Sequence, residues 1–103
     1  MHSKWDIVLA SLPFREDPNK SKTRPCVIID VDKTSNEYII IGVSSASRRE
    51  TDYQIKYYKQ ANLSNGSVIM IDHIVRVGSN GKFTYIGHLD KTDRVNVMRL
   101  MSN

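Results

Sequence analysis

Arg24 is the residue of this chain with the clearest capacity for chemistry. It follows the basic residues Lys20 and Lys22 and comes directly before Pro25. A proline drives the residue before it into an extended conformation, so the backbone that carries the Arg24 side chain is restricted. A permanently charged, planar guanidinium on a stiff backbone suits phosphate binding. The residues alone leave open an alternative, a solvated arginine that closes a strand.

Two further groups of side chains have a capacity for anion binding or proton transfer. Segment 44–51 is small, polar and basic, and its Arg48 and Arg49 either line a groove for nucleic acid or form a solvated loop. His73 carries a ring that titrates near neutral pH, but it precedes Ile74 in an apolar stretch, where histidines are more often structural. The His, Cys and carboxylate positions lack metal-ligand spacing, so we expect no metal and no cofactor.

The composition is that of a small globular protein, and we expect one domain over residues 1–103. Fifteen Lys and Arg against eleven Asp and Glu give a formal net charge of +4, an excess compatible with nucleic acid without requiring it. The single cysteine, Cys26, lies in an apolar run and predicts a buried free thiol, which fits the reducing cytoplasm. No apolar run reaches membrane-spanning length and the N-terminus does not resemble a signal peptide, so we expect a cytoplasmic protein with no membrane partner.

The elements that must position these side chains are mostly strands. Runs of β-branched and aromatic residues predict strands over 5–12, 24–32, 37–44, 52–56, 67–77 and 83–87. Pro13 is expected to end the first strand, and residues 67–77 form either one long strand or two strands bent near Asp72. Residues 57–64 suit one helical turn before the Asn65-Gly66 turn signal.

The predicted strands over 24–32 and 37–44 are almost continuously apolar, which places them centrally in a sheet covered on both faces. The polar turn between them predicts an antiparallel hairpin, so Arg24 and Ser44 should lie at the same rim. Asp90 is a natural N-cap for a final helix, whose broad apolar face should pack on the sheet through Val95, Val97, Met98, Leu100 and Met101. The pattern predicts a mainly β protein, an antiparallel barrel closed by a C-terminal helix.

Four sequence blocks, in this order, resemble the MazF/PemK family of toxins from bacterial toxin–antitoxin pairs. They are WDIVL, KTRPCVII, IIIGVSS and GSVIMIDHI with a following IGHL, at residues 5–9, 22–29, 39–45, 66–74 and 86–89. Their usual order covers nearly the whole chain. The resemblance implies a small SH3-like β-barrel of the MazF/PemK/CcdB type, a homodimer that cleaves single-stranded RNA without a metal. It also implies a cognate antitoxin that blocks the site.

The resemblance assigns roles to individual residues. The family arginine of the Arg-Pro step falls on Arg24, and the family threonine that ends the third strand falls on Ser44, so these two are the expected catalytic residues. His73 remains a weaker candidate acid or base. Polar and basic residues of the loops and the fifth strand are expected to bind RNA: Lys20, Lys22, Thr23, Ser45, Arg48, Arg49 and Arg76.

The chain also departs from the family pattern. Relatives often carry an acidic residue just before the Arg-Pro step, where this chain reads Pro-Asn-Lys-Ser over 18–21. The aspartate that some relatives carry after the fifth-strand region falls here on Gly78 or Ser79, so the general base is unassigned. Two alternatives follow: a catalytically weakened RNA-binding module, or a CcdB-like toxin that binds gyrase without catalysis. The second does not depend on the Arg-Pro step and the strand-end hydroxyl, which this chain keeps.

Overall fold

The computed structural model of the chain describes residues 1–46 and 49–102. Within these ranges the chain forms one helix and six strands. In chain order they are β1 (Asp6–Pro13), β2 (Ser21–Asp32), β3 (Glu37–Ser44), β4 (Tyr53–Gln54), β5 (Val68–Gly78), β6 (Thr84–His88) and α1 (Lys91–Met101). The one helix in this part of the chain is not long and apolar enough to cross a membrane.

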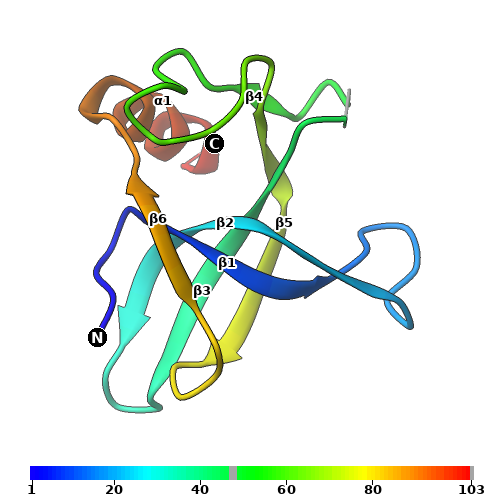
Figure 1. Ribbon diagram of the computed structural model, residues 1–103, viewed down its shortest axis with the longest axis vertical. Helices are drawn as coiled ribbons and strands as arrows, with labels where there is room; N and C mark the ends of the chain where they lie inside the picture. Colours follow the sequence, from blue (N-terminus) through cyan, green and yellow to red (C-terminus); the bar gives the residue numbers. More distant parts are fainter. Residues whose placement is uncertain (47–48, 103) are drawn as a thin grey trace.

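The six strands form one antiparallel sheet in the order β4-β5-β3-β2-β1-β6. The pairing register shifts in β1 after Ile7, between β2 and β3 after Ile28, and between β3 and β5 after Ile41. Such irregularities bend strands, and the sheet curls into a barrel with α1 packed at one end (Figure 1). The prediction of a mainly β, antiparallel barrel with a C-terminal helix is confirmed.

The central strands bury both of their faces, as their continuous apolar runs predict. On β2, Val27 and Ile29 belong to one core cluster, whereas Cys26 and Ile28 belong to a second. Successive side chains of a strand point to opposite faces, so the two clusters lie on the two sides of the sheet. The first cluster includes Val97 of α1, and the helix therefore covers that side.

Two boundaries at the start of β2 differ from the prediction. Pro13 does not end the first strand at residue 12, because it is itself paired with Ser21. Strand β2 begins at Ser21 rather than at Arg24, which pairs with Ala10 three residues inside the strand. Residues 21–23 are polar and exposed, so they carry no apolar pattern, and their pairing with β1 alone makes them a strand.

Strand β5 is a single strand, with a break in its pairing. Ile41 of β3 pairs with Ile74 and Val43 pairs with Ile69, so residues 70–73 have no partner in β3. The observed strand combines the two predicted possibilities. It is one continuous strand, and its pairing with β3 is interrupted around Asp72.

The helix buries a narrower face than its sequence predicts. Its buried residues are Asp93 and Val97, and Met101 packs against the core as a partly buried side chain. Val95, Met98 and Leu100 are exposed, so the prediction that they pack on the sheet is wrong. A short helix at the end of a barrel contacts the core along one line only. Residues 57–64 form turns instead of a helical turn.

Candidate functional site

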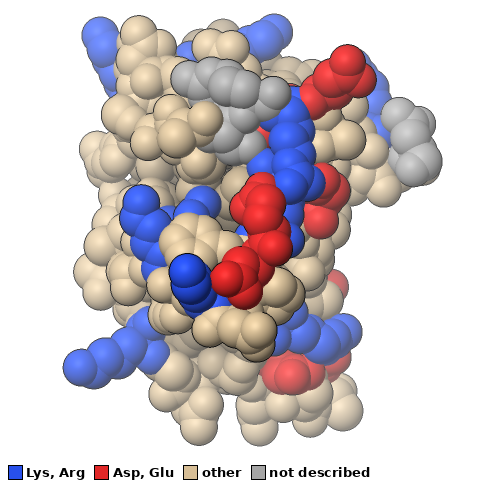
Figure 2. All heavy atoms as spheres, turned by 90° about the vertical axis from the view of Figure 1, so that its right-hand side faces the viewer, with Lys and Arg blue, Asp and Glu red and all other residues tan. Residues whose placement is uncertain are grey.

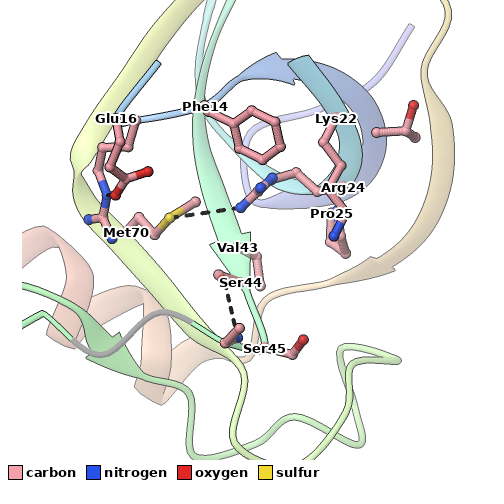
Figure 3. Close-up of a pocket in the computed structure, with 12 residues that line it drawn as sticks. Phe14, Glu16, Lys22, Arg24, Pro25, Val43, Ser44, Ser45 and Met70 are labelled. Carbon is pink, nitrogen blue, oxygen red and sulfur yellow. Dashed lines mark hydrogen bonds and ion pairs between the residues drawn. The ribbon is translucent and has the colours of Figure 1, made fainter. Parts of the chain in front are cut away.

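A pocket of about 440 Å³ opens at the rim of the sheet where β2 and β3 separate (Figure 3). Its walls come from the loop between β1 and β2, from β2, from the end of β3 and from β5. The lining residues are Phe14, Arg15, Glu16, Lys22, Thr23, Arg24, Pro25, Val43, Ser44, Ser45, Ala46 and Met70. We call this the Arg24 pocket.

Strand register brings the two predicted catalytic residues into this pocket. The ladder between β2 and β3 starts at Cys26 opposite Gly42. Continuing this register by two residues sets Arg24 across from Ser44, with both side chains on one face. Pro25 has no N–H to donate, and the pairing of β2 with β3 ends next to it. The gap that opens beyond the ladder becomes the pocket.

Arg24 is held in place by weak contacts that leave its charge available. Its guanidinium carbon lies 5.6 Å from the centre of the Phe14 ring, and its Nη1 lies 4.0 Å from the sulfur of Met70 (Figure 3). Its Nε is buried and has no hydrogen-bond partner among residues 1–46 and 49–102, nor is a carboxylate there within 4.0 Å of its nitrogens. Arg24 is partly buried, and a cation there with no carboxylate partner in the described ranges is a ready partner for an anion.

Met70 reaches Arg24 because position 42 carries no side chain. A Cβ on Gly42 would come within 2.6 Å of the terminal methyl of Met70 and within 2.8 Å of a Leu12 methyl. Gly42 therefore makes room for the side chain that borders the Arg24 guanidinium.

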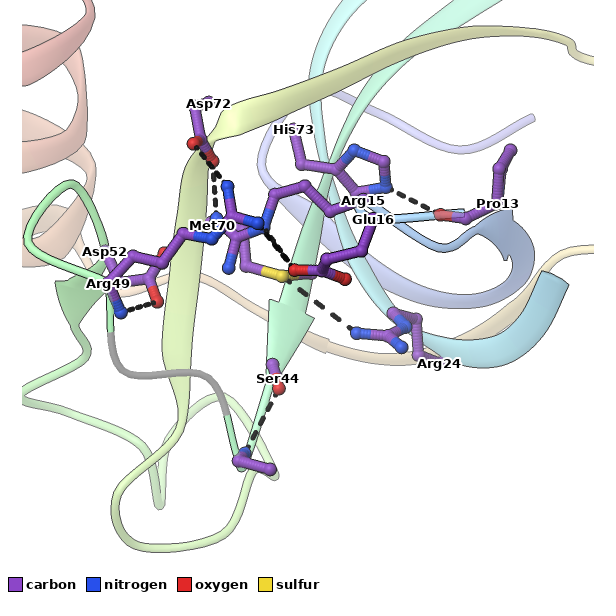
Figure 4. A network of polar contacts seen from close by, with 11 residues as sticks. Pro13, Arg15, Glu16, Arg24, Ser44, Arg49, Asp52, Met70, Asp72 and His73 are labelled. Atoms are coloured by element: carbon purple, nitrogen blue, oxygen red, sulfur yellow. Dashed lines mark hydrogen bonds and ion pairs between the residues drawn. The ribbon is translucent and has the colours of Figure 1, made fainter. Parts of the chain in front are cut away.

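A cluster of five charged residues stands beside the pocket and joins three separate segments (Figure 4). Arg15 of the β1–β2 loop pairs with Asp52 at 3.0 Å and also with Asp72 of β5. Arg49 pairs with Asp72 at 3.3 Å and with Glu16 at 2.6 Å. On this face Asp and Glu side chains lie between those of Lys and Arg (Figure 2). We call these five residues the ion-pair cluster.

The centre of the ion-pair cluster is buried, which makes it a structural element. The side chains of Arg15 and Asp52 are only 8% and 3% exposed. Asp52 also accepts a hydrogen bond from the backbone N–H of Arg49 at 2.9 Å. The cluster thereby fixes the β1–β2 loop over the pocket, because buried charges must remain paired.

Glu16 is the residue that sequence reasoning missed. It lines the Arg24 pocket, whereas the search for a carboxylate before the Arg-Pro step covered only residues 18–21. Its own backbone N–H holds the pKa of the carboxyl below the ordinary range, and Arg49 adds to this by hydrogen bonding. Glu16 is thus ionised at neutral pH. The sequence did offer one signal for Glu16, an acidic residue in the loop that precedes the catalytic candidate Arg24. Its ion-pair partner could not be read from the sequence, because Arg49 is 33 positions away.

The predicted RNA-binding residues divide between the pocket and other places. Lys22, Thr23 and Ser45 line the Arg24 pocket. Lys20 lies outside its lining, Arg49 belongs to the ion-pair cluster, and Arg48 lies outside the described residues. Arg76 is away from the pocket, paired with Asp32 at 3.2 Å and Glu37 at 3.0 Å where β2 and β3 meet their turn.

His73 joins two strands and does not line the Arg24 pocket. Its Nε2 lies 2.8 Å from the carbonyl oxygen of Pro13, so in the tautomer with a proton on Nε2 it donates to that oxygen (Figure 4). Its ring also borders the open position at Gly42, at 3.4 Å from where a Cβ would stand. These contacts describe a structural histidine. In the part of the chain that the structure describes, no three His, Cys, Asp or Glu side chains are grouped to hold a metal ion.

The ion-pair cluster should make stability depend on pH. A hydrogen bond from Arg15, with the charges of Arg15 and Arg49, holds the pKa of Asp72 below its ordinary value. Such a carboxylate stabilises the fold fully above its unfolded pKa of about 3.9, and this contribution is lost as the pH falls through the lower folded pKa. We expect the free energy of unfolding, measured with urea, to fall from about pH 5 to pH 3.

The Asp72→Asn variant should show a smaller fall over the same range, because it lacks the titrating carboxylate. Asp30→Asn is the matched control, since Asp30 accepts only from the N–H of Val31 among the described residues. An equal fall in wild type and Asp72→Asn would contradict the prediction.

Comparison with models of protein families shows the family to which this chain belongs. A sequence model of the PemK-like, MazF-like toxins of type II toxin–antitoxin systems matches residues 3–102. The chain belongs to this family. A comparison with curated proteins found no match.

Solved structures show that the toxin shares the fold of its family. It superposes on two crystal forms of MazE–MazF from Deinococcus radiodurans. Form II gives a TM-score of 0.70 at 11% identity, covering 98% of this chain and 91% of that one. Form III gives 0.75 at 9% identity, with 98% and 92% covered. At such low identity the likeness concerns the fold. The family resemblance stated from the four sequence blocks is confirmed by the match of the family model.

Proposed function

We propose that this toxin is an endoribonuclease that cleaves single-stranded RNA without a metal, in the cytoplasm. The observation that carries the proposal is the meeting of Arg24 and Ser44 in one pocket, from two strands, beside a carboxylate. Family membership supports it, because the resemblance assigns these two positions to catalysis. The buried free thiol of Cys26, whose pKa burial raises to about 12, suits a reducing compartment.

The reaction uses the ribose 2′-OH as the nucleophile. Its oxygen loses its proton to a base and attacks the adjacent phosphorus, and the bond from phosphorus to the 5′-oxygen breaks. A 2′,3′-cyclic phosphate forms, and the leaving 5′-oxygen takes a proton from water to become a hydroxyl. Negative charge grows on the non-bridging oxygens, where the unused donors of Arg24 stabilise it in a bidentate geometry. The Ser44 hydroxyl helps to orient the same phosphate, and Lys22 adds positive charge at the pocket mouth.

Glu16 is our candidate for the base that takes the 2′-OH proton. It lines the same pocket and is ionised, so it can accept a proton in the transition state. Its replacement by glutamine should slow cleavage and leave binding of 2′-O-methyl RNA unchanged. A carboxylate in this place argues against a weakened RNA-binding module.

The test is incubation of the purified toxin with mixed single-stranded RNA in the presence of EDTA. We expect fragments that end in a cyclic phosphate, and none from DNA of the same sequence, because DNA lacks the nucleophile. Intact RNA under these conditions would reject the proposal and return the gyrase-binding alternative to consideration.

Ser44 provides a graded prediction. Ser44→Thr should keep or raise the cleavage rate, because the hydroxyl is retained. Ser44→Ala should lower it about tenfold or more, the loss expected for a neutral hydrogen-bond donor at a reacting phosphate. The hydroxyl also accepts from the N–H of Ala46 at 3.1 Å, so circular dichroism should accompany the assay. Equal rates for Ser44→Ala and wild type would leave Ser44 as a strand-end residue only.

We further propose a homodimer that an acidic antitoxin segment inhibits by competing for Lys22 and Arg24. A chain of 103 residues gains buried surface by pairing, and the solved structures it resembles are of MazE–MazF. Light scattering after size exclusion should give twice the chain mass. Inhibition should weaken as salt rises, because exposed charges are screened over about 8–10 Å near physiological ionic strength. A monomer would contradict the proposed dimer, and inhibition independent of salt would contradict the proposed competition for Lys22 and Arg24.

A further inference from the structure

A second, smaller pocket lies directly beside the Arg24 pocket. The two share Pro25, Val43 and Ser45, and the second is completed by the loop before β5 and by β6. Its volume is about 170 Å³. Arg24 and Ser44 line only the Arg24 pocket, whereas Pro25, Val43 and Ser45 stand between the two pockets. A polymer that crosses this rim can therefore place one chemical group in each. We call the second the Asn62 pocket.

The walls of the Asn62 pocket are fixed against each other. The Asn62 Nδ2 donates a 2.7 Å hydrogen bond to the carbonyl of Ile86 on β6. A Cβ on Gly87 would stand 2.3 Å from the carbonyl oxygen of Ala61, so the loop packs on β6 as closely as a glycine allows. Leu63 also packs against the core. These contacts fix the loop against β6, so the pocket is formed before any ligand enters.

The lining combines apolar walls with a few polar groups. Pro25, Leu63 and Ile86 supply apolar surface, which suits the faces of a planar ring. The Ser67 hydroxyl donates to the Ser64 carbonyl, and the hydroxyls of Ser64 and Ser67 are hydrogen-bonded to each other. Two groups remain for a ligand: over residues 1–46 and 49–102, neither the Asn62 Oδ1 nor the Ser45 hydroxyl has a hydrogen-bond partner.

We propose that the Asn62 pocket binds the nucleobase next to the phosphate held at Arg24, and that Asn62 Oδ1 accepts from an exocyclic amino group of that base. The inference rests on the proposed RNA cleavage and names the specificity site of that activity. One hydrogen of the Asn62 amide nitrogen is committed to Ile86, and the amide oxygen accepts from no described residue, so this oxygen favours a base that presents an amino donor. Adenine and cytosine present amino groups at N6 and N4, whereas uracil presents a carbonyl oxygen there.

The variant that tests this is Asn62→Gly. Asn62 has a φ of 57°, in the left-handed region that glycine adopts freely, so removal of its side chain does not strain the backbone. Asn36→Gly is the matched control: Asn36 has a φ of 55° and lies in the turn between β2 and β3, away from both pockets. Circular dichroism verifies that both variants fold.

The first measurement is the mapping of cleavage sites in a random RNA pool. We expect wild type and Asn36→Gly to favour adenine or cytosine over uracil about fivefold at one position beside the cut, the ratio that one neutral hydrogen bond provides. Asn62→Gly should lose this preference and still cleave. Cleavage by Asn62→Gly with the preference unchanged would overturn the proposal, while the RNA cleavage itself stands.

The second measurement does not depend on catalysis. Fluorescence anisotropy with 2′-O-methyl pentamers of A, C or U, which lack the nucleophile, compares the affinities directly. Wild type and Asn36→Gly should bind the A or C pentamer more tightly than the U pentamer, and Asn62→Gly should lose this difference. That result supports the base pocket even if no RNA is cut. The same affinity ratios in wild type and Asn62→Gly overturn it.

Discussion

Replacing Arg24 by alanine is expected to slow RNA cleavage by about 10²–10³-fold, the usual cost of removing one preorganised charge-stabilising group. The reason is the state of this guanidinium: it lines the pocket, its Nε is buried, and no carboxylate among the described residues neutralises it. Arg24→Lys should also lose most of the rate, because a lysine keeps the charge but not the two-pronged geometry. Rates are measured on a single RNA at saturating enzyme.

Arg76→Ala is the matched control for Arg24→Ala. Arg76 is paired with Asp32 and Glu37 away from the pocket, so its loss should leave the cleavage rate near that of wild type. Circular dichroism should show the same strand content in both variants, since the Arg24 guanidinium makes only weak contacts, with Phe14 and Met70. Undiminished cleavage by a folded Arg24→Ala protein would remove Arg24 from the mechanism.

Asp93→Ala is expected to lower the free energy of unfolding by about 3–5 kcal/mol, because several donors would lose a charged acceptor at once. Asp93 is fully buried. It accepts from the Tyr53 hydroxyl at 2.5 Å and from the backbone N–H groups of Lys56 and Tyr57 at 3.0 Å each. Burial and the Asp93 carboxylate raise the pKa of Tyr53 to about 12, so this phenol stays protonated and donates at neutral pH.

Asp90→Ala is the control in the same helix. Asp90 caps α1 by accepting from the N–H of Thr92 at 2.9 Å, and loss of such a cap typically costs about 1 kcal/mol. Urea unfolding of both variants separates two roles for Asp93. If Asp93 acted only as a first-turn acid on the helix dipole, its loss would cost about 0.3–1 kcal/mol. A cost for Asp93→Ala no larger than that for Asp90→Ala would show that the buried contacts do not hold α1 in place.

The sequence by itself determined the centre of this protein. The continuous apolar runs of β2 and β3 require burial on both faces, so these strands had to lie in the middle of the sheet. Their short polar turn requires an antiparallel hairpin, which brings Arg24 and Ser44 to the same rim of the sheet. These conclusions follow from periodicity and local turn chemistry, and both can be read from neighbouring residues.

Only the tertiary structure decided which charges meet. Glu16 and Arg49 are 33 positions apart, and Arg15 and Asp72 are 57 apart. No periodicity links such residues, because their loops have no repeating pattern and each cation had several carboxylates available along the chain. The fold selects the partners by curling the sheet, which leaves Arg24 with no carboxylate partner among the described residues and gives Arg49 two, Glu16 and Asp72. The same curl brings Asn62 beside β6, where its amide nitrogen donates to the carbonyl of Ile86 and its side chain lines the second pocket.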